Sequence, residues 1–230
     1  MFIYKLKKCV LLTFFIFGLG SSCWADGNLP YVDQKLLHFG FSLGINTMSF
    51  GVKTTSDTVN ARVSTLKPGF SVGIISDLRL NRYLNLRFTP TLHFGERQLY
   101  YTPKKGGDSV TISSIPISLP IYLKYSSERK GNYRPYLIWG GGASIDLARN
   151  SENPVLLRPI DFFTEFGVGC DIYFSFFKLC PELKYSIGFN NMFTPLDERN
   201  AGQISADKKR FSTAISKLTS RMLTLTFNFE

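Results

Sequence analysis

The sequence predicts an all-β protein, an eight-stranded antiparallel up-and-down transmembrane β-barrel. Three observations support this prediction: a basic, apolar leader, a series of segments in which apolar and polar residues alternate, and a last segment of this kind that runs to the final residue. In residues 221–230, one face of the alternation is formed by Leu223, Leu225, Phe227 and Phe229. The other face is polar. This pattern suits a closed barrel with lipid outside and polar side chains inside.

The leader has the three parts of a secretory signal. Residues 1–8 are basic, residues 9–19 are apolar, and residues 20–25 are mostly small. The apolar run is shorter than the about 20 residues that a transmembrane helix needs. We expect cleavage after Ala25. A lipoprotein signal ending at Cys23 is the alternative, although such signals usually have Leu where this chain has Gly20.

This interpretation divides the chain into three parts. Residues 1–25 form a cleaved signal peptide, residues 26–36 a periplasmic N-terminal segment, and residues 37–230 the outer-membrane β-barrel domain. No later segment offers about 18 uninterrupted apolar residues, which excludes a helical inner-membrane protein.

The net charge of +10 bears on the partners of the protein. Basic charge can indicate nucleic acid, but an exported protein seldom meets any. The phosphates of outer-membrane lipids and lipopolysaccharide are the counter-charge that we expect instead.

Period-2 alternation identifies the strands. The eight predicted strands are residues 37–48, 69–80, 84–94, 112–126, 133–147, 161–174, 179–190 and 218–230. The clearest local evidence is the hairpin that turns at Asn81 and Arg82. After this turn Leu86 and Phe88 are expected to face outward, and Arg87 and His93 inward.

The connections alternate between short and long. The long ones are residues 51–68, 95–111, 148–160 and 191–217. Outer-membrane barrels have short periplasmic turns and long external loops. We therefore expect the cell outer membrane, with short turns in the periplasm and long loops outside. A soluble lipocalin-like barrel would be apolar inside and polar outside, which is the opposite arrangement.

Two further residue types qualify this picture. Tyrosine and tryptophan gather near predicted strand ends, which is typical of interfacial girdles. They are Tyr31, Tyr83, Tyr100, Tyr101, Tyr122, Tyr125, Tyr133, Trp139, Tyr173 and Tyr185. Five prolines, however, lie inside predicted strands, where each removes a ladder hydrogen bond. Two of them, Pro116 and Pro120, predict a bulge, a kink or an incompletely paired seam in strand 112–126.

Charged residues occupy many inward positions. They are Asp77, Arg79, Arg87, Lys124, Arg134, Asp146, Asp161, Glu165, Asp171, Glu182 and Lys184. An acid/base site or an ion path is one interpretation. We favour an interlocked salt-bridge plug, because an eight-stranded barrel is just wide enough for its own side chains and buried charges must be paired. A general porin is disfavoured for the same reason.

No catalytic, cofactor-binding or metal-binding residue is predicted, and no cofactor or small-molecule substrate. No helix is expected after the glycines 140–142, so they do not form a dinucleotide loop. His38 and His93 form no Ser/His/acid set by spacing, although a lipid A-modifying enzyme stays as an alternative because a triad can be assembled in space. Cys170 is expected to face lipid and Cys180 the lumen, which leaves two free, buried thiols.

The longest predicted loop, 191–217, carries the basic tract Lys208, Lys209 and Arg210. Loops of this length are usually functional or disordered. The tract could contact lipopolysaccharide phosphates or a partner protein, and plain solvation is the alternative.

Most of the chain after the leader resembles the PorT family of Bacteroidota. The similar stretches are residues 28–46, 125–146, 165–173 and 176–184. The resemblance implies a non-enzymatic outer-membrane accessory of the type IX secretion system, which exports proteases and gliding adhesins and so supports gliding motility. Other secretion components are then expected partners, and no catalytic residue is implied. The alternatives are a structural or lipopolysaccharide-binding barrel and a lipid A-modifying barrel enzyme.

Overall fold

The computed structural model describes residues 28–54, 60–63, 67–102, 108–148, 158–192 and 215–230. The predicted signal peptide, residues 1–25, lies outside the described residues and stays a prediction.

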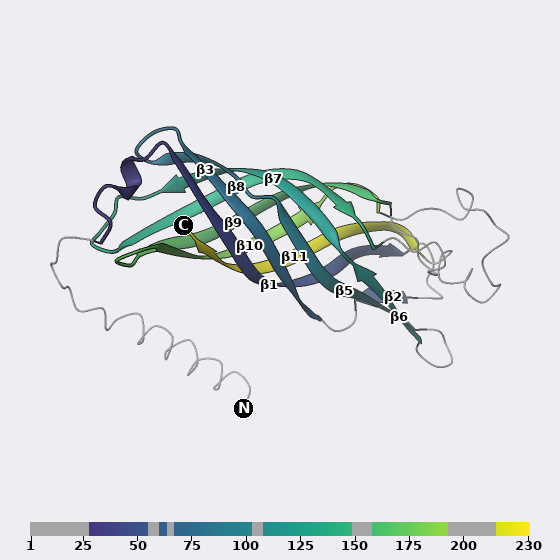
Figure 1. Ribbon diagram of the computed structural model, residues 1–230. Helices are drawn as coiled ribbons and strands as arrows, with labels where there is room; N and C mark the ends of the chain where they lie inside the picture. The colour runs from purple at the N-terminus through teal and green to yellow at the C-terminus, as the bar shows by residue number, and fades with distance from the viewer. Residues whose placement is uncertain (1–27, 55–59, 64–66, 103–107, 149–157, 193–214) are drawn as a thin grey trace, which may run out of the picture.

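The described chain forms one closed sheet with a short 3-10 helix at its start (Figure 1). The elements are η1 (Val32–Gln34), β1 (Leu37–Thr54), β2 (Asn60–Val63), β3 (Pro68–Arg79), β4 (Leu84–Phe88), β5 (Thr91–Thr102), β6 (Asp108–Ser114), β7 (Pro116–Ser126), β8 (Tyr133–Asp146), β9 (Ile160–Tyr173), β10 (Lys178–Gly188) and β11 (Ile215–Phe229). All pairings are antiparallel. Because β1 pairs with β11 on one side and with β3 on the other, the sheet closes into a barrel.

The eleven strands make eight crossings of the wall. β4 and β5 together form the third crossing, and β6 and β7 the fourth. β2 pairs with β5 on the same side as β3 and so extends the second crossing. The prediction of an eight-stranded up-and-down barrel is confirmed.

The barrel is polar inside and apolar outside. Phe39 and Trp139 are each 66% exposed on the outer surface, whereas Arg87 and Asp171 are 1% exposed in the interior. The same alternation runs along β7, where every second side chain from Pro116 onward is buried. The predicted outward and inward faces therefore match the structure, and the exposed apolar belt is the surface that a bilayer covers.

Two predicted loops are in part strands. β1 continues past Met48 to Thr54, and β5 continues to Thr102, so only residues 103–107 separate it from β6. The predicted loops 51–68 and 95–111 were therefore too long. Apolar alternation marks a strand only where its outer face meets lipid, and backbone pairing continues beyond that region.

Prolines interrupt the third and fourth crossings. Thr89 and Pro90 separate β4 from β5, and the predicted strand 112–126 is broken at Ile115. Across this seam the Thr89 N–H donates to the Pro120 carbonyl at 3.4 Å. Pro120 has no N–H to return, and the Thr89 carbonyl instead accepts from Thr91 Oγ1 at 2.9 Å. A side chain thus replaces a missing ladder bond.

The short turns have local causes in the sequence. Asn81 Oδ1 accepts from the N–H groups of Tyr83 and Leu84 at 2.7 and 2.8 Å, which reverses the chain between β3 and β4. Gly131 has φ +60° in the turn before β8, a conformation that favours glycine.

The prediction that aromatic side chains form interfacial girdles was wrong for Tyr122 and Tyr173, which are buried in the lumen.

Candidate functional site

The centre of the lumen is organised around Arg87 on β4. Its guanidinium lies 2.8 Å from Asp77 Oδ2, 3.1 Å from Glu182 Oε2 and 2.6 Å from Glu230 Oε1. These carboxylates come from β3, from β10 and from the residue after β11. All four side chains are at most 2% exposed. One arginine therefore ties the neighbouring strand β3 and two distant segments together without access to solvent.

Two lysines extend this network toward the short-turn end. Lys124 Nζ lies 2.9 Å from Asp171 Oδ2 and 4.0 Å from Asp77 Oδ2. Lys178 Nζ lies 2.6 Å from Glu230 Oε2 and 4.0 Å from Asp171 Oδ2. Each buried cation thus faces a carboxylate, as buried charge requires.

Tyr136 on β8 fills the space beside these charges. Its hydroxyl donates to Glu182 Oε2 at 2.8 Å, and Lys124 Nζ lies 4.1 Å from the centre of its ring. The ring lies against Gly169 on β9, where a Cβ atom would be 2.5 Å from the Tyr136 hydroxyl. Gly169 is therefore required by the close approach of this ring.

The middle of the barrel is closed by these side chains. Arg87, Lys124, Tyr122, Tyr173 and Glu182 are among the largest fully buried side chains of the described chain. The structure therefore supports the salt-bridge plug rather than an open path for ions or solutes.

The other half of the lumen brings together a serine and a histidine. Ser71 Oγ lies 2.8 Å from His93 Nδ1, and Asn46 Nδ2 donates to the same Ser71 oxygen at 2.7 Å. All three side chains are buried. No carboxylate among the described residues is hydrogen-bonded to His93. The pair faces the lumen, as predicted for His93. The barrel wall separates it from the lipid outside.

Arg97 lies in the same half and was hidden in the predicted loop 95–111. It is 4% exposed. One nitrogen donates to Ser220 Oγ at 3.2 Å, and the guanidinium lies 4.9 Å from the centre of the Phe50 ring. Its Nε and Nη1 atoms have no hydrogen-bond partner within the described part of the chain.

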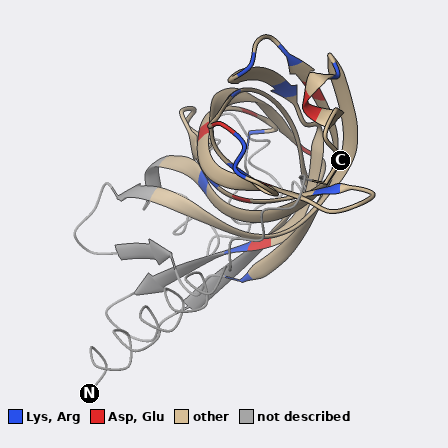
Figure 2. Cartoon of the chain, turned by 90° about the vertical axis from the view of Figure 1, so that its left-hand side faces the viewer, with Lys and Arg blue, Asp and Glu red and all other residues tan. Residues whose placement is uncertain are grey.

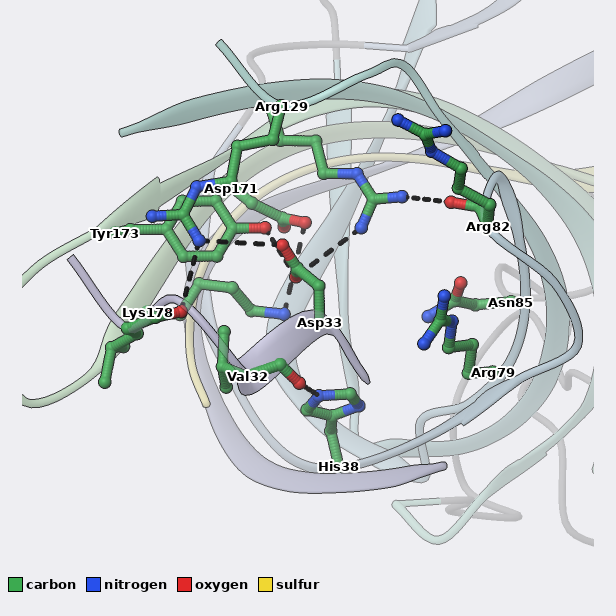
Figure 3. A network of polar contacts seen from close by, with 12 residues as sticks. Val32, Asp33, His38, Arg79, Arg82, Asn85, Arg129, Asp171, Tyr173 and Lys178 are labelled. Carbon is green, nitrogen blue, oxygen red and sulfur yellow. Dashed lines mark hydrogen bonds and ion pairs between the residues drawn. The ribbon is translucent and has the colours of Figure 1, made fainter. Parts of the chain in front are cut away.

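Residues 28–36 cover the short-turn end of the lumen, and we call them the cap (Figure 3). Asp33 is its anchor: one oxygen accepts from the Tyr173 hydroxyl at 2.7 Å. The same carboxylate lies 3.5 Å from Arg134 Nη1 and 3.7 Å from Arg129 Nη1.

Backbone groups hold the rest of the cap. Asn28 N donates to Asn132 Oδ1 at 2.8 Å, and Arg129 Nη1 donates to the Leu29 carbonyl at 3.2 Å. His38 Nε2 contacts the Val32 carbonyl at 2.7 Å. The cap is thus tied to the turn before β8 and to the start of β1. Its lack of alternation left it outside the strand patterns, and only its place in the segment 26–36 before the barrel was predicted.

Of the eleven predicted inward charges, Glu165 is buried in the lumen and Arg79 is half-buried at the end of β3. The other nine divide among three places. The central network contains Asp77, Arg87, Lys124, Asp171, Glu182 and Lys184. Arg134 serves the cap instead. At the long-connection end, Asp146 Oδ1 accepts from Ile115 N at 3.0 Å and Asp161 Oδ1 accepts from Asn190 N at 3.3 Å. The structure separates these two acids from the central network.

Sequence reasoning missed Lys178 and Glu230. Both continue the inward parity of their strands, because Cys180 and Asn228 two residues away are also buried. Lys178 lies one residue before the predicted strand 179–190, and Glu230 lies inside the predicted strand 218–230, so the period-2 alternation of each strand would have found them. Lys178 was assigned to a turn and Glu230 to no face.

Cys170 and Cys180 are free, as expected; Cys180 is buried, whereas Cys170 is only half-buried. Within residues 28–192 and 215–230, apart from the gaps named above, no three His, Cys, Asp or Glu side chains gather as metal ligands. Over the same residues, no helix is long and apolar enough to cross a membrane.

Comparison with known proteins identifies the family. The family model described as "Outer membrane protein beta-barrel domain" matches residues 24–194. The chain belongs to this family. It is an outer-membrane β-barrel, and the short-turn end is the periplasmic end.

Solved structures with a similar fold are small outer-membrane barrels. Neisserial surface protein A (NspA) has 12% identity and a TM-score of 0.42, with 84% of this chain and 98% of that chain covered. OprG from Pseudomonas aeruginosa has 9% identity and a TM-score of 0.48, with 84% and 92% covered. No curated protein matches the chain significantly.

Proposed function

We propose that this outer-membrane barrel is a non-enzymatic accessory component of protein export by the type IX secretion system. The proposal is supported by the resemblance of residues 28–46, 125–146, 165–173 and 176–184 to the PorT family. Processes that depend on exported cargo, such as protease secretion and gliding motility, would then require the barrel.

The observation that favours an accessory role is the closed lumen. Arg87 and the three carboxylates around it are at most 2% exposed, so neither cargo nor a small solute can pass through the barrel as described. The barrel must then act through what it presents outside the lumen. Those surfaces are the lipid-facing wall, the periplasmic turns with the cap, and the connections on the other side.

The partners that we propose are other secretion components, together with outer-membrane lipids and lipopolysaccharide. No nucleic acid and no small-molecule substrate are proposed. The basic tract 208–210, a candidate contact for lipopolysaccharide phosphates, lies outside the described residues.

The alternatives are a structural or lipopolysaccharide-binding barrel and a lipid A-modifying enzyme. The enzyme is disfavoured, because the Ser71–His93 pair lies inside the wall and the histidine contacts serine through Nδ1. In the serine-protease template the base contacts the nucleophile through Nε2 while Nδ1 contacts the acid. A His93→Ala strain with a changed lipid A profile would restore the enzyme hypothesis.

A clean deletion strain tests the proposal. Cargo in the medium and in the periplasm is compared by immunoblot, while outer-membrane integrity is checked with a periplasmic marker. We expect cargo to be trapped in the periplasm and secretion to return with the intact gene. Normal secretion in the deletion strain would refute the export role and leave a structural or lipid-directed barrel.

A further inference from the structure

Positive charge surrounds the periplasmic mouth of the barrel. Figure 2 looks onto this end and shows Lys and Arg positions on the turns around the opening. We call Lys35, Arg79, Arg82 and Arg129 the basic arc. These residues come from the cap, the end of β3, the turn after it and the turn before β8.

Backbone contacts make the first part of the arc continuous. The Arg79 N–H donates to the Leu36 carbonyl at 2.8 Å, which sets Lys35 beside the end of β3. Arg79 Nε donates to the Asn81 carbonyl at 3.4 Å, in the turn that carries Arg82. Lys35, Arg79 and Arg82 are thus neighbours on three adjoining segments.

Arg134 links this part to Arg129. Its Nη2 donates to the Arg82 carbonyl at 2.5 Å, and its Nη1 lies 3.5 Å from Asp33. Arg129 contacts the other oxygen of Asp33 at 3.7 Å. The arc therefore runs from the start of β1 to the turn before β8.

The acids of this end are already engaged within the chain. Asp33 is held by the cap contacts, and Glu128 lies 3.3 Å from Arg82 and accepts from the Tyr83 hydroxyl at 3.0 Å. The hydrogen bond to Glu128 and its charge raise the pKa of Tyr83. By contrast, no carboxylate of the described chain lies within ion-pair distance of Lys35 or Arg79. The arc retains uncompensated positive charge.

The mouth of the barrel already binds one carboxylate, that of Asp33 in the cap. Asp33 extends from a short peptide that crosses the opening, and two arginines and a tyrosine hydroxyl contact its oxygens. In Figure 3, Arg79 and Asn85 lie on the wall opposite the cap, and Arg79 points into the opening. A second acidic peptide could therefore meet Arg79 and Lys35 in the same manner.

We propose that the basic arc is a docking site for an acidic, extended segment of a periplasmic protein. The inference deepens the proposed function, on which it rests, by stating the chemistry of the partner. Charge complementarity at a partly exposed rim favours rapid and selective association. Lipid headgroups are a poorer fit, because Arg79 is directed into the mouth rather than toward the bilayer around the wall.

A direct binding assay tests the docking site. The full barrel, purified in nanodiscs of phosphatidylcholine, is titrated into a fluorescein-labelled peptide of alternating glutamate and glycine. A glutamine and glycine peptide of the same length is the uncharged control. We expect binding of the glutamate peptide by fluorescence anisotropy, a loss of affinity of about tenfold or more in the Arg79→Gln/Arg82→Gln variant, and weakening with salt.

The matched control variant is Arg221→Gln on β11, an exposed base that does not belong to the arc. Its affinity for the peptide should equal that of the unaltered barrel. Equal affinity in the arc variant and the unaltered barrel would overturn the inference, as would equal binding of the glutamine peptide. Retained heat-modifiable migration on gels verifies that each variant is folded.

A repeat of the titration in nanodiscs of phosphatidylglycerol distinguishes an acidic peptide from the membrane as the ligand of the basic arc. If anionic lipid abolishes peptide binding, the arc serves phosphate headgroups and the docking inference is overturned. Binding that persists in both lipids supports it. Because this assay uses neither cargo nor a secretion strain, its failure leaves the export proposal standing, and failure of the export test leaves the binding result unchanged.

Discussion

Glu230 Oε1 lies 2.6 Å from Nη2 of Arg87, so the residue that follows β11 is bound to the centre of the lumen. Its other oxygen lies 2.6 Å from Lys178 Nζ. Backbone bonds between Glu230 and Lys178, at 2.8 and 3.0 Å, hold the same position from the wall. One side chain therefore joins the end of the last strand to β4 and to the start of β10.

Replacing Glu230 by glutamine should destabilise the barrel. Arg87 and Lys178 would keep their burial but lose a carboxylate, and breaking a buried ion pair costs about 3–5 kcal/mol. Reversible urea unfolding in lipid vesicles measures the change. Glu96→Gln is the control, because the Lys67–Glu96 pair is 40% and 45% exposed and a surface pair contributes less than about 1 kcal/mol. Equal losses in the two variants would contradict the proposed role of the central network.

Arg87 and Arg97 should respond differently to replacement by methionine. Arg87 faces three carboxylates, which would be left buried without their cation, so Arg87→Met should cost about 3–5 kcal/mol. Arg97 has one hydrogen bond and two nitrogens without partners in the described chain. Arg97→Met should leave the free energy of unfolding within about 1 kcal/mol of the original or raise it, because an apolar isostere removes a desolvation cost that the hydrogen bond to Ser220 and the contact with Phe50 offset only in part.

The same urea unfolding experiment decides this comparison, with both variants in one lipid. Loss of stability in Arg97→Met comparable to that in Arg87→Met would show that Arg97 has a strong partner.

The strand parity in the sequence predicted which side chains enter the lumen but not which of them meet. Asp77, Arg87 and Glu182 were all expected inside, since each alternates with the outward apolar residues of its strand. Asp77 and Arg87 are paired directly across the hairpin of β3 and β4. Glu182 lies on β10, and its contact with Arg87 depends on the stagger between strands that are not neighbours, on which one-dimensional alternation carries no information. The salt-bridge plug was therefore predictable as a class of structure, whereas its contacts across the lumen were not.

The cap and the outer parts of the strands were not predictable for a different reason. Residues 28–36 form side-chain and carbonyl contacts without an apolar face, so no periodic signal marks them. β5 continues past Phe94 to Thr102 through backbone pairing, although the sequence of residues 95–102 does not alternate between apolar and polar residues. Patterns based on hydrophobicity detect only the parts of the barrel that lipid surrounds.

Gly169 and Tyr136 should be energetically coupled. Alanine at position 169 would put a methyl group against the Tyr136 ring, and such overpacking costs about 1–3 kcal/mol. Tyr136→Ala alone removes the bond to Glu182 and a buried ring. In the double variant the methyl group has space, so the two losses should sum to more than the observed change, with a coupling energy of at least about 1 kcal/mol. A double-mutant cycle by urea unfolding measures it, and strict additivity would refute the contact.

Asp33→Asn should loosen the cap without unfolding the barrel. The substitution removes the charge that attracts Arg129 and Arg134 and weakens the acceptor of the Tyr173 hydroxyl. Hydrogen bonds to charged groups contribute about 1.5–3 kcal/mol, so amide exchange in residues 28–36 should accelerate by about tenfold to a hundredfold. Hydrogen exchange with mass spectrometry measures this, with β9 and β10 as internal references. Gln34→Ala, at an exposed neighbouring position, is the control and should leave the exchange of the cap unchanged. Unaltered protection of residues 28–36 in Asp33→Asn would mean that backbone contacts such as Asn28 to Asn132 hold the cap by themselves.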